Sequence, residues 1–496
     1  TEAIIVTMKG GRFMEDATYW AEQLTQKKIS FSELTARIEE KIQQVEPTLN
    51  ALVSFDRQAA IKQYEQNPQT KAALFGGLPI PLKILGQSKA GWPATSAAAL
   101  FANAKAEQTS AFVNGLEQLG LIPLGQTNAP EFGFKNVTDP VLYGPTRNPW
   151  QSAYSAGGSS GGAAAVVAAG LFPLAAASDG GGSIRIPASF NGLIGLKPTR
   201  GTMPVGPQEW RSWQGASINF ALTLSMRDTE RLFYGLRTSQ PAAPYQAPRI
   251  EWKHHGPSQN RTLRVAYTTE SPAGSPVSQT AVLAVKKAVA FLEDQGHQVT
   301  EIRYPVDGQT MMASYYRMNG GETAAMFAEI EAMLQRPVEQ KDMELMTWGL
   351  YQYGKKLAAA DYIQALQYWD QLAVTMEALF ADYELFLTPA TAQTAPLIEE
   401  DLQSDTIRRE LQEIERRTAA AAGDLIYQMF DKSLALTPYT QLANLTGQPA
   451  ISLPTAVSEE GLPLGIQFMA SKGREDLLFQ VGELFERWEQ FHLPKK

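Results

Sequence analysis

The first part of the chain alternates amphipathic helical patterns with short apolar runs. Residues 14–54 carry apolar positions at helical spacing and predict two helices, and Ser30 with Glu33 has the spacing of a capping box at the start of the second. Between residues 109 and 124 a helical pattern runs directly into the apolar segment LIPLG, which is typical of a buried strand. This alternation of helix and strand indicates an α/β protein with a parallel sheet.

The second half continues the alternation around a long helical stretch. Residues 239–262 are rich in proline and polar residues and predict a surface linker, and residues 398–417 carry both charge signs, as a solvated helix face does. Strands are expected at 263–269, 297–304, 384–391, 449–457 and 462–470, helices at 277–292 and 475–490, and a long helical region at 309–383.

Composition narrows the classes of function. The chain has 496 residues, a net charge of −8 and no basic stripe, so we expect no nucleic-acid partner. The absence of cysteine excludes disulfides, thiolate catalysis and cysteine-ligated metals, and it fits a cytoplasmic protein. The first residues lack the pattern of a signal peptide. The most apolar run, 163–177, is broken by Gly170 and Pro173 and is too short to span a bilayer, so we expect no membrane association.

A glycine-rich stretch from Gly157 to Arg200 holds two serines in tight turns. Ser159 lies in GGSSGG, and Ser183 ends DGGGS. The residues between them predict a helix of small side chains and then a buried strand at 174–177. Three consecutive glycines before Ser183 leave backbone N–H groups bare, and N–H groups that converge bind anions. A hydroxyl beside such a nest has the arrangement that acyl transfer requires, although close packing alone also explains these glycines.

Other chemistries fit this stretch poorly. GGSSGG lacks the GK[ST] ending of a phosphate-binding loop. It formally matches GxSxG, but the preceding NPWQSAYSA reads as coil, whereas a nucleophile elbow follows a buried strand. A Ser-His-Asp triad or a metal site would need suitably placed histidines, and all four are expected at the surface, so we predict no metal and no cofactor. These histidines are His254, His255, His297 and His492.

One lysine stands inside the apolar run LPIPLKIL at 78–85. Lys83 either extends its ammonium to water, as lysines in apolar settings usually do, or stays buried. Burial disfavours the charged form and lowers the pKa of an amine, which can then act as a base.

On these residues the chain closely resembles the amidase signature family, serine hydrolases that cleave carboxamide bonds other than peptide bonds. The resemblance covers GLPIPLK, GQTNAPEFG, the stretch from SAGGSSGG to LKPTRG, and the tail NLTGQPAISLPTAVSEEGLPLGIQFMA. It implies the fold of that family, one large α/β domain over 1–496 with a mixed central sheet and helices on both faces. The core is expected at 60–235 and 436–496, and a more variable, largely helical part at 309–435.

The resemblance also implies roles for individual residues. Lys83 corresponds to the general base, and Ser159, which in the family follows a cis peptide bond, to the proton relay. Ser183 corresponds to the nucleophile that forms an acyl-enzyme. The backbone N–H groups of Gly180, Gly181, Gly182 and Ser183 correspond to the oxyanion hole, and Asp179 and Arg185 to supports of its loop.

The chain departs from the family at Gly180, where threonine or isoleucine is more common. Glycine keeps the N–H donor, so we expect a functional but looser loop. We interpret Ser160 as structural. The rest of the pocket is expected near Asn128, Glu131 and Asn136.

The expected partner is a small-molecule amide, and the sequence is compatible with a homodimer. DGGGSIRIP and QGASINFALT also resemble hydrolases of aminohexanoate cyclic dimers, the nylon-oligomer hydrolases. Two further alternatives are the glutaminase subunit of a tRNA-dependent amidotransferase and an inactive binding module.

Overall fold

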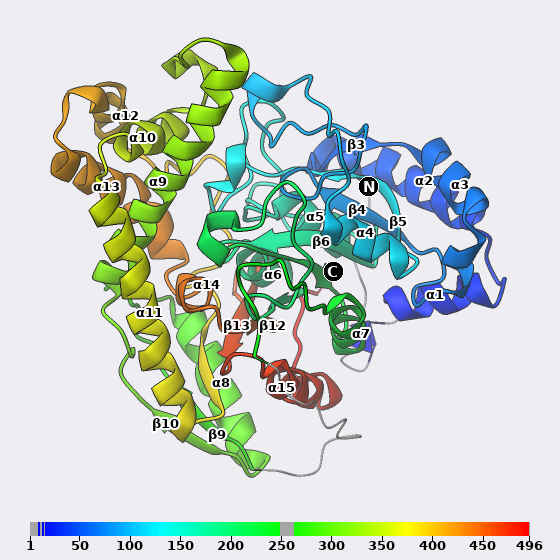
Figure 1. Cartoon of the computed structure of the whole chain (residues 1–496). Helices are drawn as coiled ribbons and strands as arrows, with labels where there is room; N and C mark the ends of the chain where they lie inside the picture. The colour runs from blue at the N-terminus through cyan, green and yellow to red at the C-terminus, as the bar shows by residue number, and fades with distance from the viewer. Residues whose placement is uncertain (1–7, 10–11, 14, 249–261, 496) are drawn as a thin grey trace.

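The computed structural model describes residues 8–9, 12–13, 15–248 and 262–495 (Figure 1). Within these residues, long helices gather on one side of the molecule and the N-terminal helices on the other (Figure 1). The helices are α1 (Ala17–Thr25), α2 (Phe31–Leu49), α3 (Arg57–Gln66), α4 (Ala111–Gln118), α5 (Gly161–Ala168), α6 (Arg185–Asn191), α7 (Met226–Leu236), α8 (Gln279–Asp294), α9 (Gly308–Leu334), α10 (Leu345–Gly354), α11 (Ala359–Asp382), α12 (Asp405–Gln412), α13 (Ala419–Leu436), α14 (Gln441–Thr446) and α15 (Glu475–Arg487).

The strands form a large mixed sheet and two smaller ones. The large sheet has the order β10-β9-β11-β13-β12-β7-β8-β6, in which β10, β9 and β11 are parallel and the remaining pairs antiparallel. In the three-stranded sheet β3-β5-β4, β5 is antiparallel to β3 and parallel to β4. The strands are β1 (Met8–Lys9), β2 (Arg12–Phe13), β3 (Leu52–Phe55), β4 (Pro79–Lys83), β5 (Ile122–Thr127), β6 (Leu174–Asp179), β7 (Ile194–Lys197), β8 (Ile218–Thr223), β9 (Arg264–Tyr267), β10 (Gln298–Glu301), β11 (Leu385–Pro389), β12 (Ala450–Val457) and β13 (Pro463–Met469).

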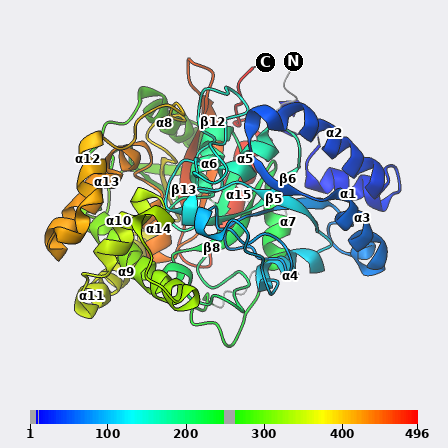
Figure 2. The same ribbon diagram turned by 90° about the horizontal axis from the view of Figure 1, so that it is seen from above.

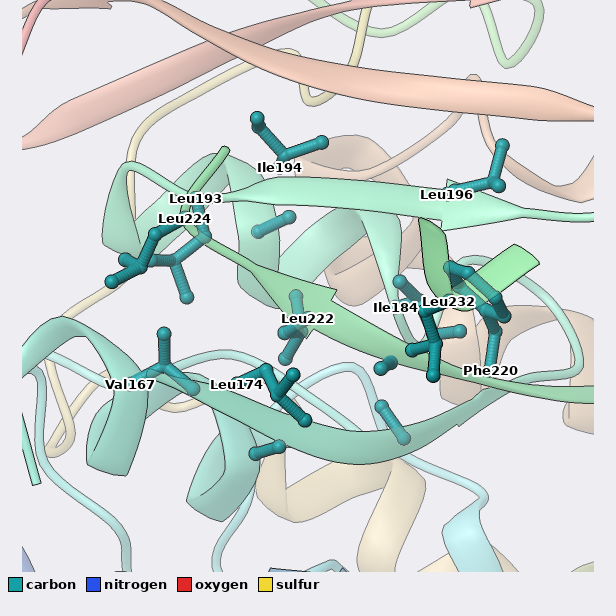
Figure 3. Packing of buried hydrophobic residues seen from close by; sticks show 14 of the residues in the cluster. Val167, Leu174, Ile184, Leu193, Ile194, Leu196, Phe220, Leu222, Leu224 and Leu232 are labelled. Carbon is teal, nitrogen blue, oxygen red and sulfur yellow. The ribbon is translucent and has the colours of Figure 1, made fainter. Parts of the chain in front are cut away.

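Four strands of the large sheet are buried on both faces. Every residue of β6, β7, β11 and β13 is buried, although successive side chains of a strand point to opposite faces. Helices therefore cover both faces of the sheet, as its mixed pairing and apolar strands require (Figure 2). Figure 3 shows part of this packing, with Leu174 on β6, Ile194 on β7 and Leu222 on β8 labelled.

A second core joins the helical layer to the sheet. Helices α9, α10, α11 and α13 pack their apolar side chains against one another, and the cluster reaches the sheet through Phe386 and Met469. This cluster is rich in methionine and aromatic residues, which fill irregular spaces between crossing helices. Within the described residues, no helix is both long and apolar enough to cross a membrane.

Most of the predicted elements are confirmed, and the errors lie at short strands. The capping box is present, because Ser30 accepts from the Glu33 N–H while the Glu33 carboxylate accepts from the Ser30 N–H. The prediction that residues 14–54 are all helical is wrong, since β3 ends this stretch. The long helical region expected at 309–383 is present and consists of α9, α10 and α11. The linker expected at 239–262 is coil up to residue 248, and residues 249–261, with His254 and His255, lie outside the described residues.

The burial of the sheet's centre leads to a prediction about the stability of the fold. Leu222 on β8 is 0% exposed, so Leu222→Ala removes buried surface and leaves a cavity. We expect it to lower the free energy of unfolding by about 2–5 kcal/mol in urea denaturation followed by circular dichroism. Leu283→Ala is the matched control, because Leu283 on α8 is 45% exposed. Equal unfolding midpoints for the two variants would contradict the packing described here.

Candidate active site

Lys83 lies at the end of β4, where the small sheet meets the edge of the large one. Its side chain is 0% exposed, so it does not reach water along the protein surface. Its Nζ donates to the hydroxyl oxygen of Ser159 at 2.7 Å and to that of Ser178 on β6 at 3.0 Å. The backbone N–H of Lys83 donates to Gln87 Oε1, which fixes the end of the strand. The amine is therefore held against two hydroxyl groups.

Burial decides the charge of this amine. Removal from water lowers the pKa of Lys83 to about 7, although the negative charge of Asp179 opposes the shift. A large fraction of the amine is neutral at pH 7. In the neutral state the same short contact lets the Ser159 hydroxyl donate its proton to Nζ.

Ser159 lies in the glycine loop that precedes α5, and its side chain is buried. The peptide bond between Gly158 and Ser159 is cis. A side chain at position 158 would collide with the backbone of Val137, so this close approach requires glycine. The neighbouring Ser160 hydroxyl donates to the Ser178 carbonyl at 3.1 Å and accepts from its N–H at 3.3 Å. Ser160 thus ties the loop to β6, in keeping with its interpretation as structural.

Ser183 follows β6 in the second glycine turn and is half-buried. The N–H of Ser160 donates to the Ser183 carbonyl at 3.3 Å, so the two loops touch. Among the described residues, no hydrogen bond joins the Ser159 and Ser183 hydroxyl groups. Such bonds often form only once a substrate is in place, when a hydroxyl turns about its side-chain torsion.

Asp179 and Arg185 form a buried ion pair beneath the turn that carries Ser183. The guanidinium donates through Nε and Nη2 to both carboxylate oxygens, each at 2.9 Å. The carboxylate also accepts from the N–H groups of Gly182 at 2.7 Å and Ile184 at 3.2 Å. Burial alone would raise the pKa of Asp179, but the Arg185 charge and hydrogen bonds from both Arg185 and Asn444 hold it below its ordinary value. A charged carboxylate thus anchors the turn.

One backbone N–H group of the glycine turn donates a hydrogen bond to a side chain, and others have no partner among the described residues. The N–H of Gly182 is engaged by Asp179, whereas within the described part of the chain the N–H groups of Gly180, Gly181 and Ser183 have no acceptor. Of the four N–H groups expected to form an oxyanion hole, three thus have no acceptor among the described residues and one is bonded to Asp179. At Gly180 a Cβ would lie 3.0 Å from the Trp213 ring, which occupies the space of the missing side chain.

Several contacts of the turn could not be recognised from sequence. Ser178 touches Lys83, and Tyr315 and Thr440 donate to carbonyl groups of the turn. Tyr315 and Thr440 come from distant segments, so only the fold brings them here. Ser178 lies on β6 just before Asp179 and the glycines, and this position beside the motif is the one signal that the sequence offers. Of the expected pocket residues Asn128, Glu131 and Asn136, only Asn136 lines a cavity beside Ser183.

Two neighbouring cavities lie on this side of Ser183. The inner one, which Ser183 lines, has a volume of about 60 Å³. The outer one, of about 440 Å³, borders it, because the two share three lining residues. The shared residues are Lys135, Asn136 and Ser433. The inner wall is formed chiefly by Phe134, Met312, Tyr315, Tyr316, Phe430 and Leu434. Among the described side chains, no group of three or more His, Asp or Glu residues could hold a metal ion.

The sequence matches known amidases along most of its length. The model of the amidase family covers residues 33–479. A lipoamidase of Enterococcus faecalis is 40% identical over 479 residues, which make up 96% of this chain and 63% of that protein. The chain therefore spans less than two thirds of the length of that relative. A 6-aminohexanoate-cyclic-dimer hydrolase of Paenarthrobacter ureafaciens is 31% identical and covers 95% of this chain and 94% of its own.

Solved structures agree with the sequence matches. A 6-aminohexanoate cyclic dimer hydrolase complexed with substrate superposes with a TM-score of 0.85 at 29% identity, over 97% of this chain and 98% of the other. A bacterial aryl acylamidase has the same fold, with a TM-score of 0.80 at 23% identity over 98% and 96% of the two chains. With the family model, the relatives and the shared fold in agreement, the chain belongs to the amidase signature family of amidohydrolases.

Proposed function

We propose that this amidohydrolase cleaves carboxamides through an acyl-enzyme on Ser183, with Lys83 as general base and Ser159 as proton relay. The observation that carries the proposal is the buried Lys83 amine, whose Nζ lies 2.7 Å from Ser159 Oγ. A serine hydroxyl is a weak nucleophile until a base takes its proton. A neutral lysine can do this, and burial supplies it at neutral pH.

In the proposed path, the proton of Ser183 passes to Ser159 and that of Ser159 to Lys83. Neutral Lys83 takes the Ser159 proton while Ser159 takes that of Ser183, and Ser183 Oγ attacks the amide carbon. The negative oxygen that develops is stabilised by the free N–H groups of Gly180, Gly181 and Ser183. The proton then returns through Ser159 to the leaving nitrogen, the carbon–nitrogen bond breaks, and water releases the acid from Ser183. Asp179 and Arg185 support this turn without entering the reaction.

The cavities favour an amide with a narrow arm at the reacting end. About 60 Å³ beside Ser183 holds the reacting amide and a few methylene groups against aromatic walls, and the outer cavity of about 440 Å³ takes the rest. Lipoamide and the aminohexanoate cyclic dimer, after the names of two relatives, are the substrates we propose to test first.

Two alternatives make different demands. A glutaminase subunit would release ammonia from glutamine only with partner subunits present, whereas a free-standing amidase acts alone. An inactive binding module would not be labelled by a fluorophosphonate at Ser183. The single domain, the cytoplasmic location and the homodimer stay predictions.

Removal of the nucleophile is the direct test of the proposal. We expect Ser183→Ala to lower hydrolysis by about 10³-fold or more, because no other hydroxyl replaces the attacking oxygen. The assay screens lipoamide, the aminohexanoate cyclic dimer, glutamine and an aryl anilide, with release of amine or ammonia as the readout. Ser160→Ala tests the neighbouring hydroxyl and should retain far more activity. Undiminished turnover by Ser183→Ala would refute the assignment.

The Lys83 base makes a prediction about pH. The active form is the neutral amine, so kcat/KM should rise with pH, reach half its maximum near pH 7 and level off above it. Lys83→Met should remove this limb and lower kcat/KM by about 10²–10⁴-fold. Lys83→Arg stays charged and should be as inactive as Lys83→Met. An unchanged profile in either variant would exclude Lys83 as the base.

A further inference from the structure

Tyr315 lies on α9 and contacts the glycine turn, although it follows Ser183 by 132 residues in the sequence. Its side chain is buried and lines the inner cavity together with Ser183. Its hydroxyl donates to the carbonyl oxygen of Gly180 at 3.2 Å. Burial raises the pKa of Tyr315, so the hydroxyl keeps its proton and remains a donor.

The carbonyl of Gly180 and the N–H of Gly181 belong to one planar peptide unit. A hydrogen bond that fixes the direction of the carbonyl therefore also fixes the direction of the N–H. Glycine backbones have the widest conformational freedom, so a run of three glycines needs outside contacts to hold one orientation. Donation to the carbonyl also polarises the peptide and strengthens its N–H as a donor.

The fit between Tyr315 and the turn is close. A Cβ on Gly181 would lie 2.4 Å from the Tyr315 hydroxyl oxygen, so any side chain at this position displaces the tyrosine. The Trp213 ring fills the space at Gly180 and contacts Tyr315 edge to face, with 6.1 Å between ring centroids. On the next peptide, Thr440 Oγ1 donates to the Gly181 carbonyl at 2.7 Å. Side chains from three distant segments thus hold the turn.

We propose that Tyr315 is a positioning residue for the oxyanion hole: its hydroxyl orients the Gly180–Gly181 peptide so that the Gly181 N–H faces the oxygen on which charge develops. This inference rests on the proposed function of Ser183. Donors oriented in advance stabilise a transition state without reorganisation when the charge appears. Loss of the Tyr315 hydroxyl therefore weakens transition-state stabilisation more than substrate binding.

The test is Tyr315→Phe, which keeps the ring and removes the hydroxyl. Because removal of an oxyanion donor itself costs about 10²–10³-fold in kcat, loss of its positioning should cost about 10-fold, with KM within about twofold. Affinity for a trifluoromethyl ketone analogue of the substrate, which forms an oxyanion on Ser183, should fall by about the same factor as kcat, while affinity for the product acid stays unchanged.

The matched control is Tyr439→Phe. Tyr439 is also buried and donates to a backbone carbonyl, that of Thr269 at 3.0 Å, but it lines neither cavity. The Tyr439→Phe variant should lose as much thermal stability as Tyr315→Phe but keep the wild-type kcat. Gly181→Ala provides a second variant, because its methyl group pushes the hydroxyl away and should likewise lower kcat.

The outcomes separate this inference from the proposed function. Wild-type activity that is lost in Ser183→Ala, together with fluorophosphonate labelling of Ser183, establishes the function. If Tyr315→Phe then matches wild type in kcat and in ketone affinity, or changes KM alone, Tyr315 has no positioning role. If the wild-type enzyme is not labelled at Ser183, the proposed function fails and this inference fails with it.

Discussion

The proposed chemistry depends on the burial of one amine. Lys83 stands at the junction of two sheets with no exposed surface, and among the described residues its Nζ donates hydrogen bonds only to the hydroxyl groups of Ser159 and Ser178. A lysine in water is charged at pH 7 and cannot accept a proton, whereas removal from water lowers its pKa to about 7. The two sheets, the glycine loops and α5 together exclude water from this point. In the proposed mechanism, the fold thereby makes a base out of a residue that is ordinarily an acid.

The second requirement is a stiff turn made of flexible residues. Glycines at 180–182 leave backbone donors bare, but they do not by themselves hold a shape. The structure supplies stiffness from outside, through the Asp179–Arg185 pair below the turn and through Trp213, Tyr315 and Thr440 around it. Close contact explains why glycine is tolerated at position 180: the indole ring occupies the volume that a side chain would take. A run of conformationally free glycines can thus form a rigid turn when the surrounding side chains hold it.

Sequence reasoning predicted the fold class, and the structure brings the residues that it singled out near one another, but the surroundings of these residues were missed. Helices with strong periodicity and the strand that precedes Ser183 are predictable, because local pattern decides them. The short strand β3 was not predicted, because it comes at the end of a segment with a helical pattern. Tyr315 and Thr440 reach the turn only through tertiary packing, and a motif gives no sign of them. The engagement of the Gly182 N–H by Asp179 is equally a matter of geometry.

The central claim is that Lys83 is a neutral amine near physiological pH, and the ionisation of that one side chain tests it most directly. Lysine labelled with ¹³C at Cε allows Lys83 to be titrated by NMR in a Ser183→Ala protein, with Lys83→Met to assign its signal. The account predicts a midpoint near pH 7 for this residue. A midpoint near the ordinary lysine value of 10.5 would contradict it, because the amine would then be charged at neutral pH.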